Sequence, residues 1–506
     1  MTSLPDWLDP LYEAAEMRAC DRWAIERAGV PSLDLMERAS VGLARLTARL
    51  ARPGLPLRVV VGPGNNGGDG LAAARLLREE GRAVDVLAVA PLDGLRGDAL
   101  VNLERLPGAP PEPFAAGALA GSGAIVDAML GTGFEGEPRQ PIAGAIAAIN
   151  EQDAPVIACD VPSGIDASTG EVVAAAVRAD ATATFHGSKP GLHVAPGAIH
   201  AGEVEVVEIG IPRGGPAAAR LGLISERVLE LFPRRQRFGS KFDSGVVAIA
   251  GGARGLTGAP AMAAMSAQRA GAGYVQVAVP AAVVQELELR LLEPMTHGLP
   301  GSGGLHSAYG VRPFAELAER AGAVVLGPGL GRSDTAVAFA RGVASSVEAP
   351  LLIDADGLNA HAGLLESLRE REGATVLTPH AGELGRLLER DRAEIDAHRL
   401  ACAREAAELS GAVVLLKGDD TIVAAPGGPV AVSPGATPAL ATAGTGDVLS
   451  GLIGALLAKG LGPFEAAALG TLAHARAGRA AAARQGADHA IAGDVIDALP
   501  DGLGSR

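Results

Sequence analysis

Short apolar runs alternate with longer amphipathic stretches along most of the chain. Residues 11–50 have apolar positions at helical spacing, interrupted at Gly29–Pro31, and therefore predict two helices. Strand-like runs rich in β-branched and aliphatic residues follow at 58–61, 84–89, 124–127, 155–160 and 203–209. The stretches between them are rich in Ala and Leu, and such alternation is typical of a parallel sheet with helices on both faces.

The same pattern begins again in the second half. Residues 212–236 are rich in Pro, Gly and Arg and predict a domain boundary. New strand-like runs then occur at 246–250, 274–279, 323–326, 351–353, 375–377 and 413–416. The sequence therefore predicts an α/β protein with a three-layer domain at 1–215, a linker at 216–236 and a second three-layer domain at 237–506.

Composition excludes several classes of protein. The 506 residues are 48% hydrophobic and carry a net charge of -15, which does not favour nucleic-acid binding because phosphate contacts need basic surfaces. Cys20, Cys159 and Cys402 lie far apart, so we expect neither a disulfide framework nor a metal-binding array, and a reducing cytoplasmic compartment fits. We expect no signal peptide, and the apolar stretch 448–458 is too short to cross a membrane.

A glycine-rich motif, GPGNNGGDG, occupies Gly62–Gly70 between a predicted strand and a helix. Its first glycines match the dinucleotide-binding pattern, and Asp85 stands near the expected acidic position, although such a match alone is weak evidence. Asn65, Asn66 and Asp69 add oxygen ligands and acid–base groups. These residue types also form ordinary turns, so turn and functional site carry similar weight here.

Two further loops follow later strands, at Asp127–Glu137 and Asp160–Asp166. The carboxyl ends of parallel strands line one crevice, so the three loops should converge. Oxygens of Asn66, Asp127 and Ser163, with loop carbonyls, could then hold a hard cation. Taken singly, Asp160 and Ser163 could equally form a helix cap or a turn.

The second half contains the motif ATAGTGDVLSG at Ala441–Gly451, which opens a helix expected from Val448. Glycines at a helix N-terminus expose N–H groups that bind phosphate, and an Asp in the same loop can accept a proton from an attacking hydroxyl. Asp447 is therefore a candidate base, although a capping acid remains the alternative.

Other polar residues of the second half stand at strand ends. Lys417, one of only four lysines, precedes Gly418–Asp420, which could contact an anion or form a solvated hairpin turn. His380 lies before a predicted helix and is a candidate ligand-binding residue, although a lone His is more often structural. Glycine loops occur at 251–259 and 327–331, and Asp354 or Asp356 could organise a metal or cap a helix.

The three N-terminal motifs together resemble the NAD(P)H-hydrate epimerase family over residues 11–210. The resemblance implies a Rossmann-like αβα fold, a potassium ion at Asn66, Asp127 and Ser163, and proton transfer by Asp160. It also implies that the hydrated nicotinamide nucleotide is bound by Asn65, Asn66, Gly67, Gly68, Asp69, Gly131, Thr132, Gly133, Phe134, Glu135, Gly136, Glu137 and Asp160.

The motifs of the second half resemble the dehydratase branch of the ribokinase-like fold over residues 237–497. In the bacterial branch of that family, ADP activates the hydroxyl of the S hydrate, and elimination gives NADH or NADPH with AMP and phosphate. The resemblance implies that Asp447 is the base and that Mg²⁺ accompanies the nucleotide. It places the hydrate against Ala259, Gly329, His380 and Asp447, and the nucleotide against Lys417, Gly418, Asp419, Asp420, Thr421, Gly444, Thr445 and Gly446.

Three positions depart from that family's pattern. Ser240 and Ala381 replace a common His and a common Pro, and residues 435–440 replace the usual approach to the phosphate-binding glycines. The last departure leaves the choice between ADP and ATP open.

The resemblance predicts repair of both epimers of NADHX and NADPHX by one homo-oligomeric enzyme, without nucleic-acid or membrane partners. A ribokinase-like small-molecule kinase with an N-terminal nucleotide-binding module is the main alternative. A non-catalytic, nucleotide-sensing N-terminal domain is a third possibility, and an NAD-dependent dehydrogenase is the weakest because only the first glycines of Gly62–Gly70 support it. Oligomeric state, preference between NADHX and NADPHX, and communication between the sites do not follow from the sequence.

Overall fold

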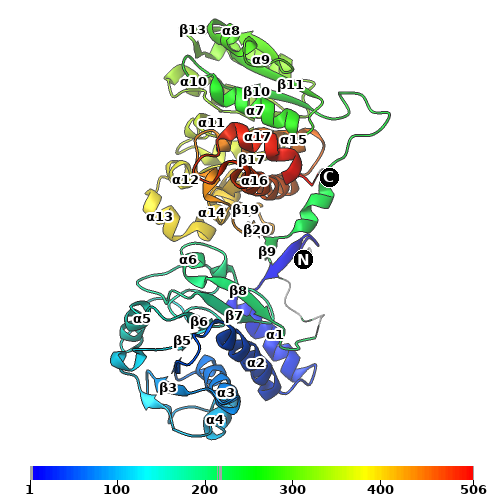
Figure 1. The fold of residues 1–506 in the computed structure, drawn as a ribbon. Coiled ribbons are helices and arrows are strands. Elements are labelled where there is room, and N and C mark those ends of the chain that lie inside the picture. The colour runs from blue at the N-terminus through cyan, green and yellow to red at the C-terminus, as the bar shows by residue number, and fades with distance from the viewer. Residues whose placement is uncertain (1–3, 213–214, 216–218, 505–506) are drawn as a thin grey trace. The chain divides into compact units, whose positions relative to one another are not determined.

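In the computed structural model, which describes residues 4–212, 215 and 219–504, the chain forms two compact units (Figure 1). The first contains Pro10–Leu221, and the second contains Gly222–Arg506 together with Pro5–Asp9. Within the described part of the chain, no helix combines the length and apolar character needed to cross a membrane.

The first unit is built on a seven-stranded sheet. Its strands are β2 (Leu57–Val61), β3 (Val84–Ala88), β4 (Glu112–Pro113), β5 (Ala124–Ala128), β6 (Val156–Cys159), β7 (Ala181–Phe185) and β8 (Glu203–Val207). They lie in the order β4-β3-β2-β5-β6-β7-β8, and every neighbouring pair is parallel. The predicted parallel sheet is thus confirmed, but β7 was not predicted because its sequence ATATF lacks a bulky apolar run.

Helices cover both faces of this sheet. They are α1 (Ala14–Glu26), α2 (Ser32–Leu50), α3 (Asn65–Glu79), α4 (Gly97–Glu104), α5 (Ile142–Asn150) and α6 (Ala198–Ala201), with short 3₁₀ turns η1 (Ala116–Leu119) and η2 (Pro190–Leu192). Alternate residues of β2 face opposite sides: Val59 and Val61 belong to the core under α2 and α3, whereas Val60 packs in the core containing α5.

The first unit has a topological switch point between β2 and β5. The chain runs from β2 outward to β3 and β4, and then returns to β5 on the other side of β2. The loops after β2 and β5 therefore diverge at the carboxyl edge, where ligands bind in open α/β sheets. This edge is where Gly62–Gly70 and Asp127–Glu137 begin.

The second unit has an eleven-stranded sheet in the order β1-β9-β20-β19-β18-β17-β16-β15-β10-β11-β12. The strands are β1 (Leu8–Leu11), β9 (Leu221–Ile224), β10 (Val246–Ala250), β11 (Tyr274–Pro280), β12 (Met295–Leu299), β15 (Ala323–Leu326), β16 (Leu351–Ile353), β17 (Thr375–Leu377), β18 (Val413–Leu416), β19 (Ile422–Ala424) and β20 (Val430–Val432). The pairs from β18 to β12 are parallel, whereas β18, β19 and β20 pair antiparallel. A separate small hairpin joins β13 (Gly301–Ser302) and β14 (Leu305–His306).

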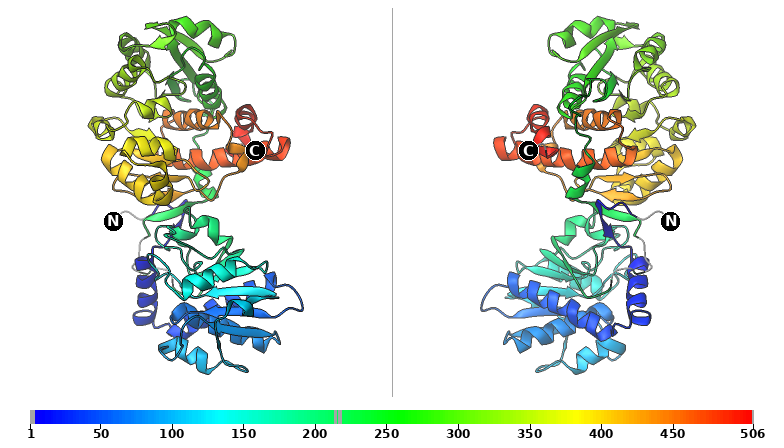
Figure 2. Two further views of the ribbon diagram at one scale, coloured as in Figure 1. Left: turned by 90° about the vertical axis from the view of Figure 1, so that its left-hand side faces the viewer. Right: turned by 90° about the vertical axis from the view of Figure 1, so that its right-hand side faces the viewer.

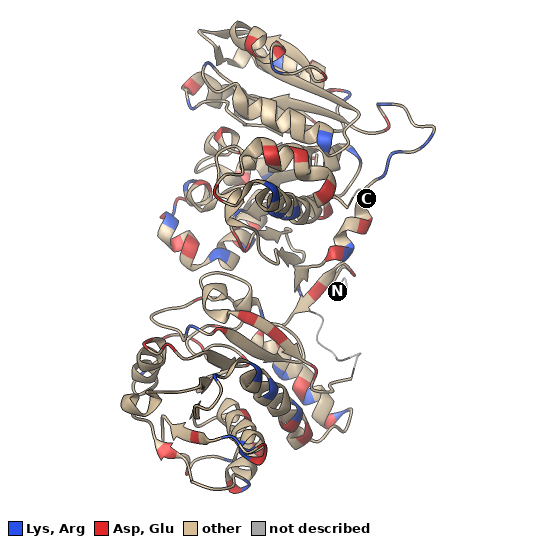
Figure 3. Cartoon of the chain, in the orientation of Figure 1, with Lys and Arg blue, Asp and Glu red and all other residues tan. Residues whose placement is uncertain are grey.

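Helices also lie on both faces of the second sheet (Figure 2). They are α7 (Gly258–Arg269), α8 (Val284–Glu288), α9 (Val311–Ala318), α10 (Asp334–Ser346), α11 (Asp356–Asn359), α12 (Ala381–Leu388), α13 (Arg392–Ala397), α14 (Arg399–Ser410), α15 (Thr445–Ala458), α16 (Pro463–Gln485) and α17 (Ala492–Gly502). The 3₁₀ turns are η3 (Glu226–Leu231), η4 (Ala281–Val283), η5 (Ala308–Gly310), η6 (Leu365–Glu370) and η7 (Pro438–Leu440). Strands β10 and β15–β18 carry no charged residue, because both faces of this sheet are covered. Figure 3 shows charged residues on the helices instead, for example on α13.

The division between the two units lies inside the predicted linker at 216–236. The division falls between Leu221 and Gly222, so most of the predicted linker belongs to the second unit and contains β9 and η3; residues 216–218 lie outside the described residues. The segment Pro5–Asp9 also belongs to the second unit, where the Trp7 ring lies 5.6 Å from the ring of Phe464. Strand β1, which begins in this segment at Leu8, has only four residues and contains a proline, so no local pattern predicts it.

Candidate active sites of the two units

The first unit has a cavity of about 780 Å³ at the switch point. Its lining comes from α1, α2, the start of α3 and the loops after β5 and β6. Of the residues predicted to bind the hydrated nucleotide, it contains Asn65, Asn66, Asp69, Gly131, Thr132, Gly133, Phe134, Glu135 and Asp160. The predicted convergence of three loops is therefore seen in the structure.

Four of the predicted binding residues do not line this cavity: Gly67, Gly68, Gly136 and Glu137. The glycine motif is also less of a loop than predicted, because α3 already begins at Asn65. Gly67 and Gly68 are buried in that helix, and a Cβ on Gly67 would lie 2.0 Å from the Gly62 carbonyl oxygen. Gly67 is therefore required for close backbone packing.

Asp160 follows β6 directly and has a left-handed backbone, with φ of 65°. Its Oδ2 accepts a 2.5 Å hydrogen bond from Thr132 Oγ1, and its Oδ1 lies 2.6 Å from Lys189 Nζ. Burial raises the pKa of Asp160, but the adjacent Lys189 ammonium and the hydrogen bonds outweigh burial, so the pKa lies below its usual value. Asp160 is thus held as a carboxylate facing the cavity.

Two of the other carboxyl groups that line this cavity have raised pKa values. Burial, followed by the charges of Asp160 and Asp21, raises the pKa of Asp69 well above its usual value. Burial likewise raises the pKa of Asp21, on α1, to about 6. The cavity therefore has a carboxyl group with a lowered pKa beside two with raised pKa values, which suits general acid–base chemistry.

The three predicted cation ligands lie next to each other. Ser163 Oγ donates a 2.6 Å hydrogen bond to Asp127 Oδ1, and Asn66 Nδ2 donates one of 2.8 Å to the Leu130 carbonyl. Asp127 is fully buried, and burial raises its pKa to about 6 despite hydrogen bonds from Ser163 and the Met129 amide. Among the described residues, no cationic side chain pairs with this carboxylate. A buried carboxylate with neighbouring oxygen ligands fits a hard cation.

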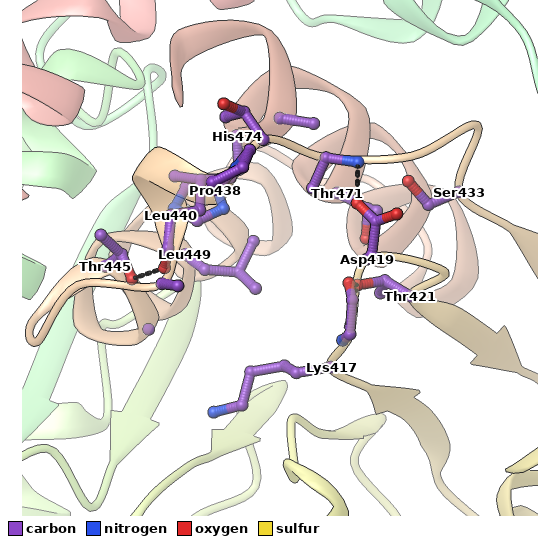
Figure 4. A pocket seen from close by; sticks show the side chains of 16 residues that line it. Lys417, Asp419, Thr421, Ser433, Pro438, Leu440, Thr445, Leu449, Thr471 and His474 are labelled. Atoms are coloured by element: carbon purple, nitrogen blue, oxygen red, sulfur yellow. Dashed lines mark hydrogen bonds between the residues drawn. The ribbon is translucent and has the colours of Figure 1, made fainter. Parts of the chain in front are cut away.

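The second unit has a cavity of about 630 Å³ between the hairpin after β18 and the start of α15 (Figure 4). Of the predicted nucleotide-binding residues, it is lined by Lys417, Gly418, Asp419, Thr421, Thr445 and Gly446. Residues 436–438 and Leu440, from the segment that departs from the family pattern, also line it. Two polar residues of α16, Thr471 and His474, also line the cavity. They were not predicted because α16 is otherwise an Ala-rich, buried helix.

Asp420 is the exception in the predicted 417–421 set. Its carboxylate lies 2.9 Å from Arg399 Nε, and both side chains are almost fully buried. Arg399 Nη2 also donates a hydrogen bond of 3.3 Å to the Lys417 carbonyl. The Asp420 side chain therefore braces the β18–β19 turn instead of lining the cavity, and the turn itself is the hairpin that the sequence left as an alternative for residues 418–420.

Asp447 stands in the first turn of α15, which begins at Thr445 and not, as predicted, at Val448. Burial raises the pKa of Asp447 to about 7, and the charge of Asp354 contributes in the same direction while Lys417 opposes it. The α15 N-terminus presents backbone N–H groups of the glycine turn, where Gly444 has φ of 93°. A carboxyl group with a pKa near 7 beside an anion-binding helix end suits a general base acting on a phosphoryl acceptor.

Lys417 connects this helix end to the rest of the site. Its Nζ lies 2.9 Å from Asp354 Oδ1 and 3.8 Å from Glu383 Oε2. Asp354 thus neither caps a helix nor stands free for a metal, whereas Asp356 accepts a 3.0 Å hydrogen bond from the Gly331 amide. Across the described residues, no group of three or more His, Cys, Asp and Glu side chains has the geometry of a metal site.

The predicted hydrate-binding residues come from three other loops. Gly329 packs against α7, where its Cβ would lie 3.2 Å from Ala259 Cβ, so these two residues do meet. His380 caps α12, with Nδ1 accepting hydrogen bonds from the Gly382 and Glu383 amides, and its side chain is about half exposed. A backbone bridge between His380 and Lys417 places this histidine beside the nucleotide turn.

Comparisons with known proteins assign both halves. Residues 247–501 match the family model for NAD(P)H-hydrate dehydratase, and residues 32–191 match that for the YjeF-related protein N-terminus. A bifunctional NAD(P)H-hydrate repair enzyme of Salinibacter ruber is 41% identical over 450 residues, covering 83% of this chain and 82% of the relative. One of Moorella thermoacetica is 39% identical, covering 83% of each chain.

A solved structure is also similar to the second unit. It is an ADP/ATP-dependent NAD(P)H-hydrate dehydratase from Bacillus subtilis, co-crystallised with ATP and Mg²⁺, with 26% identity, a TM-score of 0.49, and coverage of 55% of this chain and 96% of that one. The matches to the curated relatives extend across both units. This chain therefore belongs to the family of bifunctional NAD(P)H-hydrate repair enzymes.

Proposed function

We propose that this chain repairs hydrated nicotinamide cofactors through two reactions: the first unit interconverts (R)- and (S)-NAD(P)HX, and the second dehydrates the S form with ADP. The observation that carries this proposal is the similarity of both halves to bifunctional repair enzymes over 83% of the chain. The pairing is chemically sensible, since a dehydratase that accepts one epimer leaves the other unrepaired.

In the second unit, Asp447 is the base that accepts the proton of the hydrate hydroxyl. The hydroxyl oxygen then attacks the terminal phosphorus of ADP, and AMP leaves. Loss of phosphate from the ring carbon, with loss of a proton from the adjacent carbon, restores the reduced nicotinamide ring. The pKa of Asp447, raised by burial to about 7, supports its role as base at neutral pH.

The glycine turn and Lys417 bind the transferring phosphoryl group. The amides of Gly444 and Gly446 lie at the α15 N-terminus, whereas the Thr445 amide donates a 3.4 Å hydrogen bond to the Thr442 carbonyl. Lys417 Nζ lies 3.6 Å from where a Cβ on Gly446 would stand. Phosphoryl transfer depends chiefly on positioning and charge stabilisation, which amides and an ammonium supply. The remaining nucleotide lies along residues 418–421, and Ala259, Gly329 and His380 contact the hydrate.

Mg²⁺ is expected to enter with the nucleotide phosphates, which is its usual mode in phosphoryl-transfer sites. The lack of a dedicated acidic cluster among the described residues fits that mode. The ion, when bound, neutralises charge on the phosphates. ADP is the proposed donor, and the substituted segment 435–440 along the cavity keeps ATP as a second candidate.

In the first unit, Asp160 transfers a proton at the hydroxyl-bearing ring carbon, in contact with the nucleotide held by Asn65–Asp69 and Gly131–Glu137. Asn66, Asp127 and Ser163 would hold potassium, which would supply positive charge between the three loops. The buried Asp127 carboxylate, which has no cationic side-chain partner among the described residues, supports that site.

The test follows recovery of the absorbance of reduced nicotinamide from a purified R/S hydrate mixture, with ADP, with ATP and with neither nucleotide. We expect complete recovery with ADP, no recovery for Asp447→Asn, and recovery of only the S fraction, followed by a slow spontaneous phase, for Asp160→Asn. No recovery with either nucleotide by folded protein would overturn the assignment. Consumption of nucleotide with a stable phosphorylated product would indicate a kinase instead.

A further inference from the structure

Lys189 is buried at the floor of the first unit's cavity, and its ammonium has three hydrogen-bond partners. Nζ donates to Asp160 Oδ1 at 2.6 Å, to Thr184 Oγ1 at 2.8 Å and to the Phe185 carbonyl at 3.0 Å. The side chain is only 1% exposed. Since an ammonium has three N–H donors, none remains to bind substrate, so any role of Lys189 is exerted through Asp160.

The Asp160 carboxylate is fixed from both sides. Lys189 binds Oδ1, while Thr132, from the loop after β5, donates a 2.5 Å hydrogen bond to Oδ2. The backbone is fixed as well, because the Asp160 amide donates a 2.8 Å hydrogen bond to Ala183 of β7 in a left-handed conformation. A non-glycine residue keeps such a conformation only where its surroundings hold it, which is typical of functional sites.

The charges facing Asp160 are otherwise mostly negative. Asp69 on α3 and Asp21 on α1 line the same cavity, and Asp98 on α4 and Arg18 on α1 lie at its wall. Lys189 is the cation that acts on Asp160, Asp69 and Asp21 alike. Without it, a buried carboxylate among other carboxyl groups would take up a proton and lose its capacity as a base.

We propose that Lys189 is a positioning residue of the epimerase reaction, which keeps the Asp160 carboxylate charged and aimed into the cavity. The inference rests on the proposed function, in which Asp160 transfers the proton. This role also accounts for the burial of Lys189, because a lysine is almost never fully buried unless its charge is paired.

The test compares Lys189→Met and Lys189→Arg in the full chain by the rate at which the R hydrate becomes available to the dehydratase, measured from pH 5.5 to 9. Lys189→Met should create an acidic limb within this range, where the parent has none because its Asp160 pKa lies below the usual value. It should also lower the rate at pH 5.5 about tenfold, with little change in KM. Lys189→Arg should recover part of the rate and move the limb back to lower pH. Thr182→Val, which removes another buried hydrogen bond of β7 outside the cavity, is the matched control and should leave the profile unchanged.

A double variant keeps the test decisive if Lys189→Met destabilises the unit. Asp160→Asn/Lys189→Met removes both charges, and it should epimerise no more slowly than Asp160→Asn alone because Lys189 acts only through Asp160. An unchanged pH profile for Lys189→Met, or a further loss of rate in the double variant, would overturn the inference. The unmodified chain distinguishes the two proposals. If it does not accelerate recovery of the R hydrate, the proposed epimerase function is wrong; if it does and Lys189→Met has an unchanged pH profile, only the inference about Lys189 is wrong.

Discussion

The ammonium of Lys417 lies 2.9 Å from Asp354 Oδ1, at the point where β18 ends. The other oxygen of Asp354 accepts a 2.7 Å hydrogen bond from Ser450, one turn along α15 from Asp447. A single buried carboxylate thus ties the lysine of the nucleotide turn to the helix that carries the candidate base. The predictions for the second unit depend on this connection.

The pH dependence of dehydration should report Asp447. Burial raises its pKa to about 7, so the group is mostly protonated below pH 7 and ionised above it. A base acts in its ionised form, so kcat/KM for the S hydrate should rise about tenfold per pH unit below 7 and level off above pH 8. A flat profile between pH 5.5 and 9, after subtraction of spontaneous decay of the hydrate, would contradict the assignment.

Replacing Lys417 should affect both the nucleotide and the base. Lys417→Met removes an ammonium that lowers the pKa of Asp447, so the acidic limb should move to higher pH. It also removes a charged contact to phosphate worth about 1.5–3 kcal/mol, so KM for ADP should rise by roughly 10- to 100-fold. Lys459→Met, at the opposite end of α15, is the matched control and should preserve KM.

The ion pair between Arg399 and Asp420 should contribute to stability and to the shape of the nucleotide turn. Arg399→Met removes the 2.9 Å ion pair from the buried Asp420 carboxylate, which should lower the free energy of unfolding of the second unit by about 1.5–3 kcal/mol. Arg399→Met/Asp420→Asn should recover much of that loss in denaturant titrations. Equal stability of the single variant and the parent would show that the pair is not needed.

Two glycines of the first unit provide a matched pair. A Cβ on Gly67 would lie 2.0 Å from the Gly62 carbonyl oxygen, whereas one on Gly64 would meet no atom within 4 Å. Gly67→Ala should therefore lower the free energy of unfolding by about 1–3 kcal/mol, and Gly64→Ala should change it by less than about 0.5 kcal/mol. Similar melting temperatures for both variants would contradict the packing described for α3.

Potassium should stabilise the first unit if it binds Asn66, Asp127 and Ser163. A ligand at ten times its dissociation constant adds about 1.4 kcal/mol, so thermal unfolding should shift upward with KCl but not with tetramethylammonium chloride at equal ionic strength. Asp127→Asn should remove the difference between the two salts. A potassium effect that persists in that variant would place the ion elsewhere.

The local patterns predicted most strands because buried parallel strands are apolar along their whole length. They failed for β7, whose Ala and Thr residues are too small to form an apolar run. They also failed for β1, β4, β9, β12–β14, β19 and β20, most of which have four residues or fewer. The starts of two helices were also predicted too late: α3 begins at Asn65 and α15 at Thr445. Glycine disfavours helix, so these glycine-rich segments become helical only through packing in the folded protein.

What the sequence determined by itself was the set of local motifs and their order: two α/β halves, the glycine-rich segments at strand ends, and Asp160 and Asp447 as candidate acid–base residues. Only the tertiary structure placed Lys189, 29 residues after Asp160 along the chain, in contact with that carboxylate, and turned Asp420 toward Arg399. The physical reason is that pKa shifts and ion pairs depend on burial and on neighbours from distant strands. Neither burial nor those neighbours is encoded in local spacing.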